Sequence, residues 1–375
     1  MSGKIKIISL LAEVAVLWLY LPLLVGAQES ITRITIFPNN LNLVEKINTI
    51  KLKAGINEIT FGPVRKGVIL NSVYPEAEGC QFLEQEYSSD FFLSWKIRSE
   101  KEKETTLRVV YLTTGLDWKV SYQVAVDKED RFVGLSAWAT VENKSGMNFS
   151  EVYLTLTTQV PRKVTQEEEE EVSSQNLSES YLSDSQNFSY SVAYPITLRS
   201  GERKRILLFT GRSIPIKKVY LFNGAKYGKE VREELLLKNS PDLGLGMPLP
   251  QGPVYVYKRD LRDRINFIGQ DIFPETPPKR EARIFLGEAK CLEGERVQTS
   301  YQQLPTSEKE FSYKIILYNS ADLPITVEVV EHLYGEWTIL ESQPENYEKK
   351  ENLVVFEVEI PAGQKKEIQY KARAK

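Results

Sequence analysis

The chain has little of the residue types that most metal and catalytic sites use. Its 375 residues include one histidine and two cysteines. A zinc site needs several converging Cys or His ligands, and a disulfide-stapled scaffold needs several cysteine pairs. Lys plus Arg number 48 and Asp plus Glu number 51, so the basic excess of nucleic-acid-binding proteins is also absent. We therefore expect no metal, no cofactor and no nucleic-acid partner.

Recognisable catalytic motifs are absent as well. A Ser-His-Asp triad would have to use His332, and the chain has no Gly-x-Ser-x-Gly turn to supply the nucleophile. Paired carboxylates could serve a glycosidase, but among 51 acidic residues some pair always has suitable spacing. We predict no catalytic residue, and the question of enzymatic activity stays open.

The one long apolar run lies at the N-terminus. Residues 1–27 combine Lys4 and Lys6 with an apolar segment, and small residues precede a cleavage point between Ala27 and Gln28. This pattern predicts a secretory signal peptide, with an uncleaved N-terminal anchor as the alternative. No later run approaches the ~20 residues of a membrane-spanning helix. We expect an extracytoplasmic protein (periplasmic, cell-surface or secreted) whose mature chain does not span the membrane.

An oxidising compartment would allow Cys80 and Cys291 to form a disulfide. The loop that it would close is long, so the bond would stabilise the fold by roughly 4–5 kcal/mol in the chain-entropy model. The alternative, which we favour, is two buried free thiols that behave as small apolar side chains.

Alternation of apolar and polar residues dominates the rest of the chain and predicts an all-β fold. Apolar residues alternate over 93–97 and again over 107–111, which we interpret as partner strands. Residues 49–53 and 59–61, around a turn at 54–57, predict a hairpin. Residues 120–126 and 133–141 flank an acidic turn and predict a second one.

The fold class that we predict is tandem antiparallel β-sandwich units. We divide the chain into an N-terminal β region (28–105), a β-sandwich (106–255) and an immunoglobulin-like sandwich (256–375). Residues 163–190 include five consecutive glutamates and few aliphatic residues, which predicts a mobile acidic loop inside the second unit.

Three aromatic residues stand out. Tyr122 shares its alternating face with three valines, so we expect it and Trp118 to pack in the core. Trp138 is out of phase with the apolar residues around it and faces the other side of its strand. We regard Trp138 as a candidate contact surface for a sugar or a protein.

The chain resembles an uncharacterised bacterial domain family. Gly115-Leu116-Asp117-Trp118 with Tyr122, followed by Asn143-Lys144-Ser145-Gly146, is similar to the C-terminal domain of mucoidy-inhibitor-A-like proteins, and the similarity continues to Pro361-Ala362-Gly363. It covers about residues 106–375. The resemblance implies an extracytoplasmic β-rich protein with no established activity and a link to the cell envelope. Many members of the family carry a histidine at the position that Glu275 occupies in this chain, so a role of that histidine is not assigned to this protein.

Two strand ends look alike. Apolar strands end in Asn143-Lys144-Ser145 and in Asn319-Ser320, which alone does not establish an internal repeat.

Two functions fit these observations. The first is a secreted, non-enzymatic cell-envelope or protein-interaction protein whose partner is an envelope protein or a polysaccharide. The second is a carbohydrate-binding or carbohydrate-cleaving extracytoplasmic protein, which would need an exposed aromatic strip. An adhesin-like module that uses an open sheet edge is a third possibility, although charges such as Lys365-Lys366-Glu367 would protect an edge.

Overall fold

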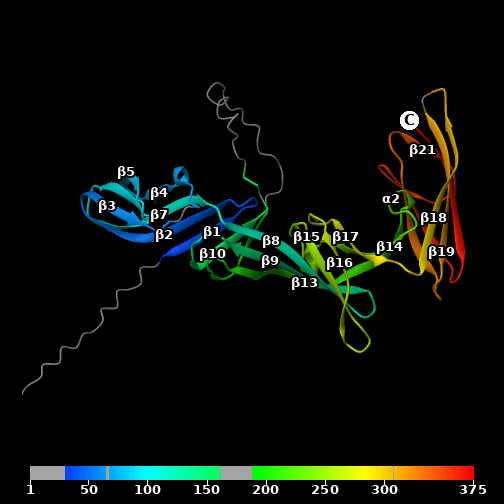
Figure 1. Ribbon diagram of the computed structural model, residues 1–375, viewed down its shortest axis with the longest axis horizontal. Helices are drawn as coiled ribbons and strands as arrows, with labels where there is room; N and C mark the ends of the chain where they lie inside the picture. Colours follow the sequence, from blue (N-terminus) through cyan, green and yellow to red (C-terminus); the bar gives the residue numbers. More distant parts are fainter. Residues whose placement is uncertain (1–29, 65–66, 159, 162–187, 307) are drawn as a thin grey trace, which may run out of the picture.

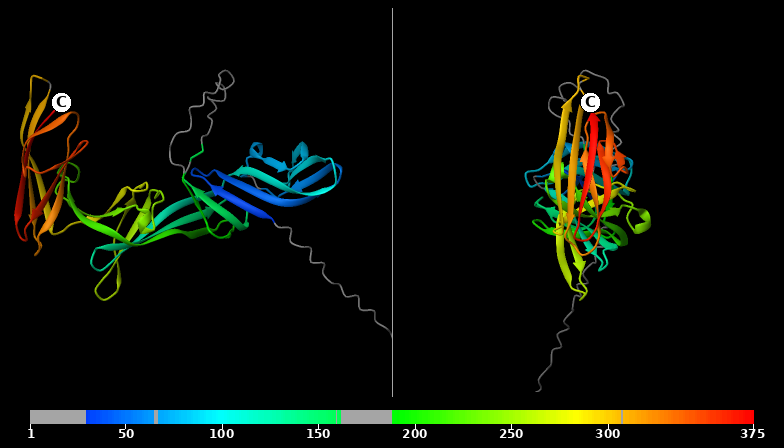
Figure 2. Two further views of the ribbon diagram at one scale, coloured as in Figure 1. Left: turned by 180° about the vertical axis from the view of Figure 1, so that it is seen from behind. Right: turned by 90° about the vertical axis from the view of Figure 1, so that its right-hand side faces the viewer.

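The computed structural model describes residues 30–375 except 65–66, 159, 162–187 and 307. The predicted signal peptide, its Ala27–Gln28 cleavage point and most of the predicted acidic loop lie outside these residues. The prediction of an all-β fold of sandwich units is confirmed. The molecule is elongated, with β3 and β5 at one end and β18, β19 and β21 at the other (Figures 1 and 2).

The strands differ widely in length, and the helices among the described residues are single turns. In chain order the elements are β1 (Ile31–Ile36), β2 (Asn42–Leu52), β3 (Gly55–Phe61), η1 (Leu70–Ser72), β4 (Tyr74–Ala77), β5 (Cys80–Tyr87), β6 (Leu93–Ser99), β7 (Lys103–Thr113), β8 (Leu116–Val126), β9 (Phe132–Asn143), β10 (Phe149–Thr157), β11 (Ser189–Ser191), β12 (Ile196–Leu198), β13 (Arg203–Phe222), α2 (Gly224–Tyr227), β14 (Val231–Lys238), η2 (Pro241–Leu243), β15 (Gly252–Arg259), β16 (Ile265–Phe273), β17 (Glu281–Glu288), β18 (Leu292–Gln303), β19 (Lys309–Asn319), β20 (Ile325–His332), β21 (Trp337–Gln343), β22 (Glu348–Lys350), β23 (Leu353–Ile360) and β24 (Lys365–Ala374).

Strand pairing reveals four successive units with the same five-strand plan, whose positions we name a to e. In each unit a pairs with b, b pairs with e, and c pairs with d, all antiparallel. The units, written from a to e, are β1-β2-β3-β6-β7, β8-β9-β10-β12-β13, β13-β14-β15-β16-β17 and β18-β19-β20-β23-β24. The 20-residue β13 serves as e of the second unit and then as a of the third.

Parallel pairs join consecutive units. Strand c of each later unit lies beside strand a of the unit before it: β10 pairs with β1, β15 with β8, and β20 with β13. Each link therefore makes a continuous sheet of order d-c-a-b-e across two units. One face of such a sheet contributes side chains to two consecutive hydrophobic cores. On β9, for example, Ala139 packs in the first core cluster and Leu135 packs in the second.

Buried asparagines close the strand ends in three of the units. Asn143, Asn239 and Asn319 each follow or end strand b and are fully buried. In every case the side-chain amide donates to a backbone carbonyl at or just after the end of strand d, namely that of Leu198 (3.0 Å), Thr276 (2.9 Å) or Ile360 (3.1 Å). Each Asn Oδ1 also accepts a backbone N–H from the loop that follows. These shared bonds show that the similarity of Asn143 and Asn319 reflects an internal repeat.

The structure corrects three sequence expectations about local pairing. The strands at 42–52 and 55–61 do not form a hairpin, because β2 pairs with β1 and β7 whereas β3 pairs with β6. Strands β6 and β7 likewise lie in different sheets, because the chain crosses from one layer of the sandwich to the other between them. The predicted loop 163–190 ends too late, since Tyr190 lies in β11, is buried and donates a hydrogen bond to the Pro248 carbonyl.

Other expectations agree with the fold. Leu93, Trp95 and Ile97 share a buried face, and β8 and β9 form the predicted hairpin. The predicted unit boundaries at 105/106 and 255/256, by contrast, each cut through a strand, β7 and β15 respectively. No helix among the described residues is long and apolar enough to cross a membrane.

Candidate functional site

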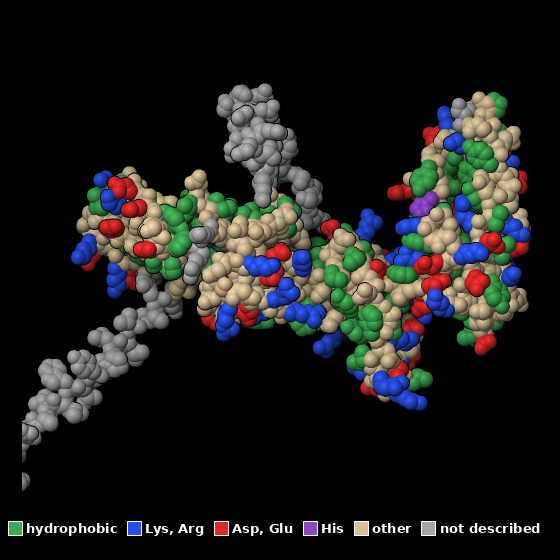
Figure 3. Space-filling model, in the orientation of Figure 1, with side chains coloured by type: hydrophobic (Ala, Val, Ile, Leu, Met, Phe, Trp, Pro, Cys, Tyr) green, Lys and Arg blue, Asp and Glu red, His purple; other side chains and the backbone are tan. Residues whose placement is uncertain are grey.

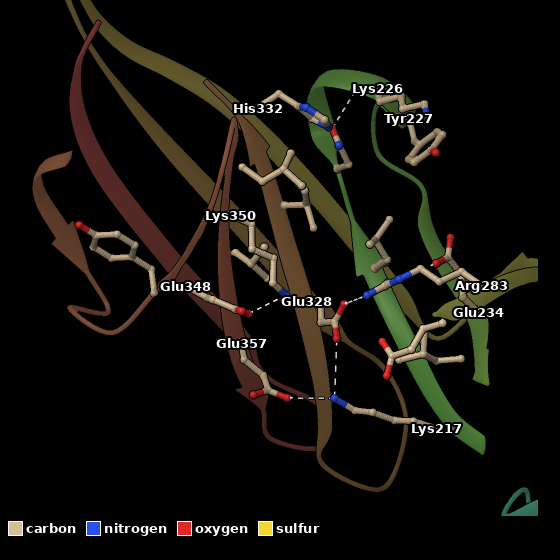
Figure 4. Close-up of a pocket in the computed structure, with 18 of the residues that line it drawn as sticks. Lys217, Lys226, Tyr227, Glu234, Arg283, Glu328, His332, Glu348, Lys350 and Glu357 are labelled. Carbon is tan, nitrogen blue, oxygen red and sulfur yellow. Dashed lines mark hydrogen bonds and ion pairs between the residues drawn. The ribbon is translucent and has the colours of Figure 1, made fainter. Parts of the chain in front are cut away.

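The sheet that joins the third and fourth units leaves its second face open. Strands β17, β14, β13, β20, β23 and β22 present alternate side chains to this face, since residues paired across neighbouring strands point to the same side of the sheet. They line a groove of about 1070 Å³, which we call the open-face groove (Figure 4). The opposite face carries the buried residues Phe222, Val329 and Phe356, which pack in the core of the fourth unit.

A band of alternating charges crosses the groove. Glu234 lies 3.5 Å from Arg283, whose Nη2 donates to Glu328 at 2.9 Å. Lys217 lies 3.7 Å from Glu328 and 3.5 Å from Glu357. The five residues come from β14, β17, β20, β13 and β23, so the band connects five strands (Figure 4).

The charges of this band are compensated within the protein. Burial alone would lower the pKa of Arg283, but its hydrogen bond with Glu328 and the charges of Glu328 and Glu234 raise the pKa overall. The side chains of Glu234 and Glu328 are 9% and 15% exposed, respectively, so they have given up most of their hydration. The ion pairs therefore hold these charged groups at defined positions in the groove.

An apolar strip lies beside the charged band. It consists of Leu221, Val330, Leu353 and Val355, which line the groove at successive strands β13, β20 and β23. His332 borders the strip, stacks on Tyr334 with 6.4 Å between ring centres, and is seen at the surface of the C-terminal lobe in Figure 3. The chain's single histidine is thus an exposed rim residue of the groove.

A short helix forms one wall of the groove. Helix α2 is capped by Asn223, whose side chain accepts from the Lys226 amide. Its Tyr227 ring lies 4.4 Å from the guanidinium of Arg232, which also covers Phe285 at 3.8 Å. This stack fixes the wall against the sheet.

A buried charge cluster lies on the other side of β20. Arg296 donates to both carboxylate oxygens of the fully buried Glu331 at 2.8–3.0 Å, and Tyr370 donates to the same carboxylate. Arg296 also stacks on Tyr313 at 3.5 Å. Burial first, and then the carboxylate, raise the pKa of Tyr370 far above its usual value, so its hydroxyl stays protonated. The cluster links the two sheets of the fourth unit, and its position inside the core indicates a structural role.

Trp138 lies on the equivalent open face of the preceding sheet. It pairs with Ser121 of β8 and with Leu207 of β13, which is 44% exposed. The guanidinium of Arg205 covers the indole at 4.7 Å from the ring centre. The indole Nε1 has no hydrogen-bond partner among the described residues.

A second, smaller groove lies further along the same face. It has a volume of about 520 Å³ and is lined by residues that include Gln123, Gly134, Ser136 and Tyr257. Tyr255, Phe267 and Ile272 of β15 and β16 are exposed nearby on these strands. Trp138 on the same face is half-buried beneath Arg205, whereas Tyr255 and Phe267 present exposed aromatic rings.

The remaining predicted residues have structural positions. Tyr122 is fully buried, stacks on Phe273 at 4.5 Å and donates to the Pro250 carbonyl. Trp118 packs against two cores and donates to the Thr157 carbonyl. Both confirm the expectation of core packing. Cys80 and Cys291 are free; they pack against the first and the last core, at opposite ends of the molecule.

The arrangement offers binding chemistry. Among the described residues no three His, Cys, Asp or Glu side chains converge as metal ligands. In the sequence Glu328 lies between Val327 and Val329, but nothing in it showed that Arg283 and Lys217 would lie beside it. These contacts depend on strands that are 45 or more positions apart.

The fold and groove define an elongated array of β-sandwich units with open sheet faces. Residues 107–375, from within β7 to the C-terminus, match the family described as Domain of unknown function (DUF4139), and the chain belongs to this family. No curated protein matches the sequence.

Proposed function

We propose that the protein is an extracytoplasmic, non-enzymatic component of the cell envelope that binds a protein partner in the open-face groove. The observation that carries the proposal is the groove itself, where an apolar strip runs beside a charge band on an uncovered sheet face. A protein segment can place apolar side chains on the strip and polar groups on the band.

The rigid setting of the groove favours binding over catalysis. Glu328 lies between Arg283 and Lys217, and Glu357 also lies near Lys217. These ion pairs hold the side chains at defined positions on the sheet face. Such fixed charges select partners with complementary charge.

The location in the envelope is supported by the sequence. Residues 1–27 have the features of a secretory signal, and the similarity to mucoidy-inhibitor-A-like proteins points to envelope biology. An array of four linked units also spans a long distance with few residues, which suits a protein that connects components in this compartment.

The experiment is capture of partners from native cells with the mature chain, residues 28–375, as bait. Wild type is compared with Leu353→Arg, which places a cation on the apolar strip. Leu340→Arg is the matched control, since Leu340 is 39% exposed on β21, outside the groove. We expect one reproducible envelope protein with wild type and Leu340→Arg but not with Leu353→Arg. Retention on polysaccharide alone, or equal capture by all three chains, would refute the proposal.

A second candidate function is carbohydrate binding on the Trp138 face. The aromatic residues Trp138, Tyr255 and Phe267 lie on one sheet beside the smaller groove, and aromatic rings stack on the apolar faces of sugars. Purified envelope polysaccharide should then bind wild type and lose affinity for Tyr255→Ala. Equal retention of both chains would rule this function out.

A further inference from the structure

The array ends in two strands that lack the partner found at every internal link. At each link, strand a of one unit pairs in parallel with strand c of the next. Strand β18 is a of the last unit and is the edge of its sheet, β18-β19-β24-β21. Strand β3 is c of the first unit and is the edge of the sheet β3-β6-β5. Among the described residues, the two ends therefore have complementary vacancies.

We propose that two copies of this chain associate head to tail, with β18 of one copy pairing in parallel with β3 of the next. The occupant is a second copy, because the same chain supplies both halves of a link that it already makes three times within itself. Such a contact joins two different surfaces, so a pair of copies still has an unpaired β18 at one end and an unpaired β3 at the other. Further copies can add at both ends, and the contact therefore generates a chain of molecules. The inference does not depend on the proposed function.

Both edges are free over the required length. Outside the β19 ladder, the described backbone of 295–303 makes no hydrogen bond, and 58–61 makes none outside the β6 ladder. Residues 297–303 contain no charged residue and no proline, although natural sheet edges are commonly protected by them. Val297 and Tyr301 are 41% and 57% exposed.

The charged residues expected to protect an edge lie away from β18. Lys365, Lys366 and Glu367 begin β24 and pair with β19 on one side, while the β21 ladder on the other side starts only at Gln369. The ladder of β18 has an irregularity between Gln298 and Ser300, but β15 has one too and still pairs in parallel with β8. Irregularity of the strand therefore does not prevent the link.

The repeat also gives the register. In the β13–β20 link, Tyr220 lies opposite Val327. In every internal link the paired residues share one face of the sheet, as Phe222 and Val329 do on the core side. Counted from the first core-facing position of strand e in each unit, Gln298 corresponds to Tyr220 and Ile59 corresponds to Val327. We expect Gln298 of one copy to lie opposite Ile59 of the other, at the strand spacing of about 4.8 Å.

The contact should be reversible. In the second unit, β8 offers buried Tyr122, Val124 and Val126 beside its link, whereas the matching part of β18 offers Gln298, Ser300 and Gln302. The intermolecular link thus buries less apolar surface than the internal ones, and less apolar burial means lower affinity.

Sedimentation velocity over a range of concentrations tests the association. We expect the average mass of residues 28–375 to rise with concentration. Val297→Lys places a charge on the β18 edge and should hold the chain monomeric. Val160→Lys, at a position 58% exposed and far from both edges in sequence, should behave as wild type. A monomer at every concentration, or equal association of all three chains, would overturn the proposal.

Cysteine cross-linking tests the geometry even if Val297→Lys disturbs the fold. The chain is first freed of cysteine by Cys80→Ser and Cys291→Ser, and Ile59→Cys and Gln298→Cys are introduced in separate copies. Oxidation of the mixture should give a covalent dimer, because neighbouring strands bring the Cα atoms within disulfide range. Ile59→Cys mixed with Leu261→Cys, on the exposed β15–β16 turn, should not. Cross-linking of Gln298→Cys only to itself would show a symmetric contact and overturn the head-to-tail arrangement.

Discussion

The buried asparagines should be the polar residues whose substitution most destabilises the second, third and fourth units, and Asn319→Ala tests this in the fourth. The Asn319 amide donates to the carbonyls of Leu323 at 2.8 Å and Ile360 at 3.1 Å, and its oxygen accepts from the Ala321 amide at 2.9 Å. Alanine leaves two carbonyls and one amide without a partner around a fully buried site. Each unsatisfied buried group costs about 1–3 kcal/mol.

Taking the low end for each of the three groups, we expect the free energy of opening of the fourth unit to fall by about 3 kcal/mol. Since 1.4 kcal/mol is a factor of ten, amide hydrogen exchange in β19 and β24 should accelerate about 150-fold. Mass spectrometry of peptides from these strands measures it, and peptides of the first unit serve as an internal reference. Asn352→Ala, at an exposed turn, is the matched control. An acceleration below about fivefold, or equal to that of the control, would refute the reasoning.

Three further predictions concern the same framework. Gly294→Ala should destabilise the fourth unit by about 1–3 kcal/mol in denaturant unfolding, because its Cβ would clash with the Phe222 ring, whereas Gly134→Ala, with open space around it, should change little. Glu331→Ala should cost about 3–5 kcal/mol by leaving Arg296 unpaired, and a thermal midpoint within about 2 °C of wild type would contradict the buried ion pair. Lys371 and Arg373 lower the pKa of Glu310, so the stability that this carboxylate contributes is present above the unfolded-state pKa and is lost as pH falls through the lower folded-state pKa. The melting-temperature advantage of wild type over Glu310→Gln should therefore shrink as the pH falls from neutral into the acid range, and an advantage that grows on acidification would refute this assignment.

The alternation in the sequence predicted strands and their buried faces but not their partners. Leu93, Trp95 and Ile97 were placed on one buried face correctly, because a period of two depends only on the local chain. After β2 the chain could form a hairpin at 53–55 or cross there to the other layer of the sandwich. Packing with β6 and β7, which are distant in sequence, decides between these two courses. Hairpins were therefore assigned where the chain changes layer.

The internal repeat was only partly visible for a similar reason. Asn143 and Asn319 each bond to the carbonyl four residues later, so their neighbourhoods look alike in sequence. Asn239 reaches instead to Met247, eight residues later, because the short helix η2 is inserted between them. The third copy could be recognised only from its hydrogen bonds and strand pairing.

The groove could not be predicted because it is a property of the sheet. Glu328 and Arg283 each lie between two apolar neighbours on their strands, a pattern shared by many strands that face water on one side. Their proximity to each other and to Lys217 follows from the parallel link between β13 and β20. Trp138 was placed correctly on the face away from the core, but not beneath Arg205.

The central claim is that the open-face groove holds a protein partner in the cell envelope, and photo-cross-linking in native cells tests it most directly. A photoreactive amino acid is placed at Leu353 in the groove or at Leu340 on β21, each in the full chain. We predict a discrete cross-linked protein of the envelope fraction from position 353 and none from position 340. No cross-linked protein at position 353, or the same products from both positions, would contradict the claim.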